Sequence, residues 1–274
     1  VRQAVNHLAT AEDKGQGSVF TRREVVEFML DLTGYVAEAE LATKRLLEPS
    51  FGGGDFLVVV IERLLGSARR FGIDIGADSY LLSDSIRAVE LNSSTFSSTR
   101  MVVRNCLVTH GVPPDHAEIL VAKWLRHDDF LLWDTEELFD FVVGNPPYVR
   151  LELIPDVLLK EYGRRFPTMR DRADLYVPFL ERGLGLLRQG GTLTFICSDR
   201  WLKNAYGRHL RNTISRSYSF QYYIDMTGTD AFMDSVTAYT GVFVIRRSEP
   251  SPLMICRHPP ANVGALPHVG QTLF

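Results

Sequence analysis

The segment FDFVVGNPPYVR, residues 139–150, indicates the fold class because it joins a buried strand to a stiff polar turn. Its first five residues form a short, mostly apolar run, which is typical of strands that are covered on both faces. Gly144 ends the run, and the two prolines fix their own backbone angles and hold the residue before each in an extended shape. We therefore expect residues 145–148 to form a rigid tip at the carboxyl end of a strand, where open α/β sheets bind their ligands.

The tip carries groups that suit a planar ring with an exocyclic amine. Asn145 offers a side-chain carbonyl oxygen, and Pro146 offers a backbone acceptor with no competing N–H. Tyr148 adds a flat aromatic face. Asn-Pro alone is also a common turn former, but a strand followed by NPPY resembles the catalytic motif of amino-methyltransferases that use S-adenosylmethionine.

Helical and extended segments alternate along most of the chain. The helices are expected at residues 20–33, with Thr21 as N-cap, and at 55–65, 94–109, 175–187 and 201–217. The strands are expected at residues 44–47, 86–91, 123–127, 139–143, 192–197, 220–224 and 238–246. Residues 151–172 show no clear period and are predicted to be a loop. This alternation predicts an α/β fold with a doubly wound, Rossmann-like sheet, mostly parallel, with an antiparallel edge hairpin.

Three regions divide the sequence. Residues 1–19 are a polar N-terminal segment, and residues 20–247 form the expected catalytic domain. Residues 248–274 are rich in Pro and Gly and are predicted to be a tail or linker without a core element. Since the chain starts with valine, we expect it to be a fragment or a processed product.

Composition excludes several classes of protein. The chain has 274 residues, 45% of them apolar, which suffices for one large α/β domain. Its net charge of −3 is unlike that of a complete nucleic-acid binder, so any basic surface must be local or lie elsewhere. The three cysteines are far apart, which argues against zinc or disulfide frameworks. No apolar run is long enough to span a membrane and no signal peptide is visible, so we expect a cytoplasmic protein.

A glycine-rich loop, EPSFGGGDFL, separates the first expected strand from its helix. Glycines let a backbone approach a ligand closely, and a helix start directs free N–H groups to the same place. A tight turn would also explain glycine here, but three in a row exceed that need. The loop matches neither a P-loop nor the dinucleotide fingerprint. The expected ligand contacts of the loop are Glu48, Pro49, Ser50, Gly52 and Gly54.

Acidic and aromatic residues follow the next two strands. Glu90 ends the second strand, where a carboxylate can accept both hydroxyls of a ribose. Asp129 and Phe130 follow the third strand, where they could accept from an adenine amine and stack on its ring. Phe130 could instead pack in the hydrophobic core. Glu90 could instead be a solvent-exposed residue or the start of a helix.

The order of these parts resembles the gamma class of DNA adenine-N6 methyltransferases, the TaqI-like branch of restriction–modification systems. The resemblance runs from about residue 20 to residue 247. It includes Thr21 with VVEFM, the glycine loop, the acidic residues after two strands, NPPY, and Phe232 in AFMDSV. It departs from the family pattern at Arg22, where proline is frequent, and at Asn92, where aspartate is common.

The resemblance implies site-specific transfer of a methyl group from S-adenosylmethionine to N6 of an adenine flipped out of double-stranded DNA. Asn145 and Pro146 would accept the amine hydrogens, Pro147 would stiffen the tip, and Tyr148 and Phe232 would contact the base. Thr21 would join the cofactor residues, and no metal would be needed. Such enzymes carry a separate target-recognition domain and act with a restriction nuclease, fused or separate.

A basic segment, KEYGRRFPTMRDR at residues 160–172, follows the tip. Its net charge of +3 fits contact with DNA phosphates through Arg164, Arg165 and Arg170. A solvated loop with internal ion pairs is an equal alternative.

Two other functions stay open at this point. The same motif occurs in N-methyltransferases that act on a protein glutamine amide or on structured RNA. A degenerate methyltransferase fold kept as a DNA-binding subunit is a non-enzyme alternative, although the glycine loop and Asn145 are intact.

Overall fold

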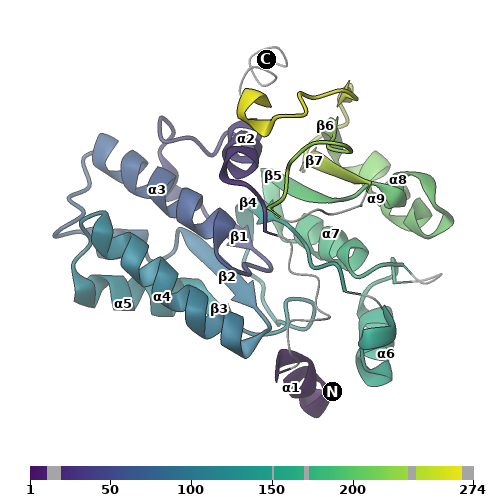
Figure 1. Cartoon of the computed structure of the whole chain (residues 1–274), viewed down its shortest axis with the longest axis horizontal. Helices are drawn as coiled ribbons and strands as arrows, with labels where there is room; N and C mark the ends of the chain where they lie inside the picture. The colour runs from purple at the N-terminus through teal and green to yellow at the C-terminus, as the bar shows by residue number, and fades with distance from the viewer. Residues whose placement is uncertain (11–19, 150, 170–172, 234–238, 267–274) are drawn as a thin grey trace.

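The computed structural model describes residues 1–10, 20–149, 151–169, 173–233 and 239–266. Within these residues eight strands form one sheet in the order β3-β2-β1-β4-β5-β7-β6-β8 (Figure 1). The strands are β1 (Leu46–Glu48), β2 (Ile86–Glu90), β3 (Leu125–His127), β4 (Phe139–Gly144), β5 (Leu187–Ser198), β6 (Ser219–Asp225), β7 (Thr240–Arg246) and β8 (Met254–Cys256).

The pairing confirms the predicted mostly parallel sheet with an antiparallel hairpin. Strands β3, β2, β1, β4 and β5 are parallel neighbours, whereas β7 runs antiparallel to both β5 and β6. The strand order changes direction between β1 and β4. From β1 the chain goes on to β2 on one side of this point, and from β4 it goes on to β5 on the other side. Ligands bind at such a switch point in doubly wound sheets, outside the carboxyl ends of the strands.

Helices cover both faces of the sheet because neighbouring strand residues point to opposite sides. Leu46 of β1 packs into the core on one face and Leu47 into the core on the other. The first face is covered by α2 (Arg23–Thr33), α3 (Asp55–Arg70), α4 (Ser93–Thr109) and α5 (Pro114–Trp124). The second is covered by α1 (Arg2–Thr10), α6 (Asp156–Arg165), α7 (Tyr176–Gly185), α8 (Arg200–Lys203) and α9 (Arg208–Ser217).

The predicted loop at residues 151–172 is wrong, because residues 156–165 form helix α6. Leu158 and Tyr162, one turn apart, bury their side chains against the second face of the sheet. The other positions are mostly charged or exposed, so the apolar stripe is too narrow to show a period.

The predicted helix at residues 201–217 is interrupted. Helix α8 ends at Lys203, and α9 begins at Arg208 after a short 3₁₀ turn. A Cβ atom at Gly207 would fall on the Trp201 carbonyl group, so the chain turns here at a residue without a side chain. The Arg211 guanidinium donates to the carbonyl oxygens of Trp201 and Asn204, which closes the turn.

The prediction that no core element follows Arg247 is also wrong. Strand β8 pairs with β6 in parallel, and both Val263 and Leu266 are buried in the core on the first face of the sheet. The side chains of Met254 and Ile255 are exposed, so β8 lacks the alternation by which strands are recognised.

None of the described helices is both long enough and apolar enough to cross a lipid bilayer.

Candidate active site

The glycine loop between β1 and α3 has a backbone that other residues cannot readily adopt. Gly52 and Gly54 have φ angles of +47° and +91°. A Cβ atom on Gly54 would also lie 2.9 Å from a methyl group of Thr99. The Thr99 hydroxyl donates to the Gly52 carbonyl oxygen at 2.6 Å, which fixes the loop from the α4 side. The loop leads directly into the first turn of α3, and the first turn of a helix leaves backbone N–H groups without an intrahelical partner.

Two carboxylates lie beside this loop. Glu90 accepts hydrogen bonds from the backbone N–H groups of Gly52 at 3.0 Å and Asn92 at 2.7 Å, which orient it firmly. Glu48 is only 1% exposed, and its Oε2 atom has no hydrogen-bond partner among the described residues. Burial raises the pKa of Glu48 well above its ordinary value, and the negative charges of Asp55 and Glu90 raise it further.

Asp129 and Phe130 are held by residues from the second face of the sheet. Asp129 is buried, accepts from the Tyr162 hydroxyl at 2.5 Å, and accepts from the Leu131 N–H at 2.8 Å. Burial raises the pKa of Asp129, and these hydrogen bonds act in the opposite direction. The Phe130 ring packs on Phe179 with centroids 5.0 Å apart, so it belongs to the core and lines the pocket as well.

The NPPY tip follows β4, as its sequence predicts. Gly144 ends the strand, and the Asn145 side-chain NH₂ group donates to the Thr21 hydroxyl oxygen at 3.3 Å. The Tyr148 hydroxyl is buried without a partner among the described residues. Burial raises the pKa of Tyr148 well above its ordinary value, so the phenol stays neutral.

Thr21 lies between the start of α3, which follows the glycine loop, and the tip, rather than at a helix cap. The N-cap position of α2 is Arg22, and it forms no side-chain capping bond. Thr21 instead donates its backbone N–H to Asp55 at 2.9 Å and forms an antiparallel bridge with Phe232. The capping interpretation of Thr21 is therefore wrong, because its hydroxyl is engaged by Asn145.

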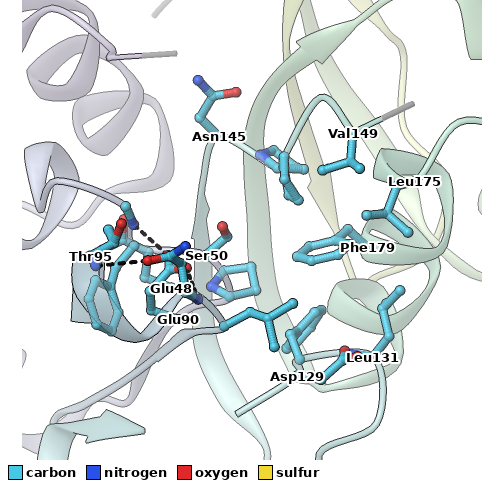
Figure 2. Close-up of a pocket in the computed structure, with 18 of the residues that line it drawn as sticks. Glu48, Ser50, Glu90, Thr95, Asp129, Leu131, Asn145, Val149, Leu175 and Phe179 are labelled. Atoms are coloured by element: carbon cyan, nitrogen blue, oxygen red, sulfur yellow. Dashed lines mark hydrogen bonds between the residues drawn. The ribbon is translucent and has the colours of Figure 1, made fainter. Parts of the chain in front are cut away.

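One pocket brings most of the predicted residues together. Figure 2 shows Glu48 and Glu90 close to each other, with Asn145, Asp129 and Phe179 around the same space. The predicted residues that line it are Thr21, Glu48, Pro49, Ser50, Gly52, Glu90, Asp129, Phe130, Asn145, Pro146 and Pro147.

Other predicted residues lie outside the pocket lining. Gly54 shapes the start of α3, Tyr148 is the last residue of the tip, and Phe232 is 8% exposed in the core on the first face of the sheet. Arg170 falls outside the described residues.

Arg164 and Arg165 lie on α6 and share one acidic partner. Both form ion pairs of 2.7 Å with Glu161, which they hold at a pKa of about 2. Arg165 also donates to the Leu132 carbonyl oxygen. The internal ion pairs expected if this segment is solvated rather than bound to DNA are therefore present. The Arg164 side chain is nevertheless 70% exposed and can reach solvent.

Sequence reasoning missed several residues that line the pocket, among them Asp55 and Tyr162. Asp55 is the first residue of α3 and lines the pocket, and its acidic character at a helix start was a usable signal. Tyr162 had no such signal, because the segment that contains it was predicted to be a loop.

Comparison with known proteins now decides the family. Residues 87–232, just over half of the chain, match the Eco57I restriction-modification methylase family. The chain belongs to the Eco57I restriction-modification methylase family. The match spans Glu90, Asp129 and the NPPY tip.

Individual proteins agree with membership of the Eco57I methylase family. The type II methyltransferase M.PaeR7I of Pseudomonas aeruginosa is 49% identical over 94% of this chain and 45% of its own length. The type II methyltransferase M.XhoI of Xanthomonas vasicola is 45% identical over 94% of this chain and 47% of its own length. This chain thus spans just under half the length of these relatives.

A solved structure supports the fold of this Eco57I-family chain. A Listeria monocytogenes protein assigned to the class I S-adenosylmethionine-dependent methyltransferases superimposes with a TM-score of 0.64. The alignment covers 93% of this chain and 72% of that protein at 16% identity, so it bears on the fold alone.

Proposed function

We propose that this chain is the catalytic domain of a restriction–modification DNA methyltransferase that methylates N6 of adenine, with S-adenosylmethionine as donor. The observation that carries the proposal is the shared pocket at the strand switch point, which joins Glu48, Glu90, Asp129 and Asn145. Family membership supports DNA methylation, and the NPPY tip supports an exocyclic amine as the acceptor.

The residues around the pocket fit S-adenosylmethionine. Its cationic groups suit the buried Glu48 carboxylate, whose Oε2 atom has no partner among the described residues. Glu90 is oriented by two N–H donors and is suited to accept from ribose hydroxyls. Asp129 and Phe130 would hold the adenine of the cofactor, while Thr21, Pro49, Ser50 and the loop glycines Gly52 and Gly54 would complete the enclosure. When bound, the cofactor supplies an electrophilic methyl group.

The chain's own residues would then orient the acceptor amine. Asn145, through its side-chain oxygen, and Pro146, through its backbone oxygen, would accept the two N6 hydrogens. Acceptance of both hydrogens reduces conjugation of the nitrogen lone pair with the ring and directs it towards the pocket. The rate gain in this proposal comes from positioning and preorganised polarity rather than from a strong base.

The target adenine must leave the duplex to reach the tip, as in other enzymes that act on a base. Tyr148 and Phe232 are proposed to contact the extruded base, and Pro147 to keep the tip rigid. Arg164, Arg165 and Arg170 are proposed to contact phosphates. Since the curated relatives are about twice as long, we assign sequence choice to regions of the full-length protein outside residues 1–274, and restriction cleavage to a fused or separate nuclease.

Transfer of label tests this proposal against its alternatives. The full-length protein is incubated with methyl-labelled S-adenosylmethionine and, separately, duplex DNA, structured RNA or a glutamine-bearing protein. We expect label in DNA alone. Label in RNA or protein, or DNA binding without transfer, would instead support the other enzyme class or a degenerate binding subunit.

A further inference from the structure

Thr21 connects three parts of the site that are distant in the sequence. Its backbone N–H donates to Asp55 at the start of α3, and its hydroxyl accepts from the Asn145 amide. Its backbone also forms the bridge to Phe232. Thr21 is 1% exposed, so water does not compete for these contacts.

The backbone on both sides of Thr21 is fixed by pairing with the segment around Phe232. The N–H of Met233 donates to the Phe20 carbonyl oxygen at 3.0 Å, and the N–H of Arg22 donates to the Ala231 carbonyl oxygen at 3.0 Å. Together with the Asp55 contact, these bonds hold the residue from three directions. This fixed backbone, together with the few χ1 rotamers open to a β-branched side chain, gives the hydroxyl a defined position as a reference point for its partner.

Asn145 needs such a reference because its amide has two different ends. Its neighbours Gly144 and Pro146 restrict the backbone, but the side chain can still rotate. With the NH₂ group directed to Thr21 at 3.3 Å, the carbonyl oxygen is turned away from the hydroxyl. A half-turn of the amide would exchange the two ends, and an NH₂ group cannot accept a hydrogen bond from an amine.

We propose that Thr21 is a positioning residue for methyl transfer, whose hydroxyl holds the Asn145 amide with its carbonyl oxygen directed to the acceptor amine. This inference rests on the proposed function and adds a residue that acts through Asn145. A role as a mere cofactor contact makes a different prediction, since it would lower cofactor affinity. A positioning role lowers turnover instead, because small misplacements of reacting groups are costly in rate.

The experiment compares three variants of the full-length protein in turnover on duplex DNA and in affinity for S-adenosylmethionine by calorimetry. Thr21→Val keeps the shape but removes the hydroxyl, and we expect kcat to fall about 10- to 100-fold with cofactor affinity little changed. Thr21→Ser keeps the hydroxyl and should restore most of the turnover. Thr194→Val is the matched control, because the Thr194 hydroxyl is also buried but has no partner among the described residues.

The outcomes separate this inference from the function on which it rests. If the unaltered protein methylates no amine, the proposed function fails and the positioning role fails with it. If the unaltered protein is active and Thr21→Val turns over normally, or loses only cofactor affinity, the positioning role alone is overturned. If Thr21→Val does not fold, Thr21→Ala removes the same hydroxyl without adding a methyl group in its place and is read by the same criteria.

Discussion

At the scale of single residues, three of the carboxylates that line the pocket interact through their charges. Glu48, Asp55 and Glu90 all line it, and the pKa of Glu48 is raised by burial and by the charges of the other two. Burial also raises the pKa of Asp55, while the Thr21 N–H lowers it. Such a pocket favours a cationic ligand, because a positive charge offsets the repulsion between carboxylates.

The raised pKa of Glu48 has a consequence for stability. The folded state binds the Glu48 proton more tightly than the unfolded state does, so stability falls as pH rises from the unfolded pKa through the folded one. We expect Glu48→Gln to raise the free energy of unfolding above this window and to change it little at lower pH, where the carboxyl is protonated in both states. Urea unfolding at several pH values measures this.

The control for that prediction is Glu38→Gln, which makes the same change at a site outside the pocket. Its effect should be small, because the Glu38 side chain is exposed. Equal effects of the two variants at neutral pH would contradict the account of Glu48. Cofactor affinity should fall about tenfold or more in Glu48→Gln, since a charge-assisted hydrogen bond is lost.

At the scale of elements, the start of α3 depends on a glycine that no other residue replaces well. Gly54 combines a φ angle of +91° with a close approach to Thr99. It also occupies the N-cap position of α3, the helix whose first turn faces the pocket. A side chain at this position would therefore disturb both the glycine loop and the start of α3.

We expect Gly54→Ala to lower the free energy of unfolding by about 1–3 kcal/mol, from the left-handed backbone and the crowded methyl group. Gly163→Ala in α6 is the matched control, because a Cβ atom there meets nothing within 4 Å. That change should stabilise slightly, by about 0.5 kcal/mol, since alanine favours helix. Chemical denaturation measures both, and a Gly54→Ala protein as stable as the control would refute the assignment.

At the scale of the whole molecule, the sheet was predictable because strand and helix patterns alternate and most of the central strands are rich in apolar residues. The pocket followed, because the carboxyl ends of parallel strands meet at one edge. Helix α6 and strand β8 were missed since few of their side chains are buried.

The contacts of Thr21 could not be predicted from the sequence, because they are long-range. They link residues 34 and 124 positions apart, and no local spacing rule relates such positions. Asn145 was recognised from its motif, whereas the residue that holds its amide could be found only in the folded chain. The same applies to Tyr162, which reaches Asp129 from a helix that the sequence did not reveal.

The most direct test of the central claim is the chemical identity of the methylated nucleoside. Duplex DNA is treated with the full-length protein and S-adenosylmethionine, digested to nucleosides and analysed by mass spectrometry. We expect N6-methyl-2′-deoxyadenosine, and its loss in Asn145→Ala with cofactor binding retained. Methylated cytosine, or undiminished adenine methylation in Asn145→Ala, would contradict the account.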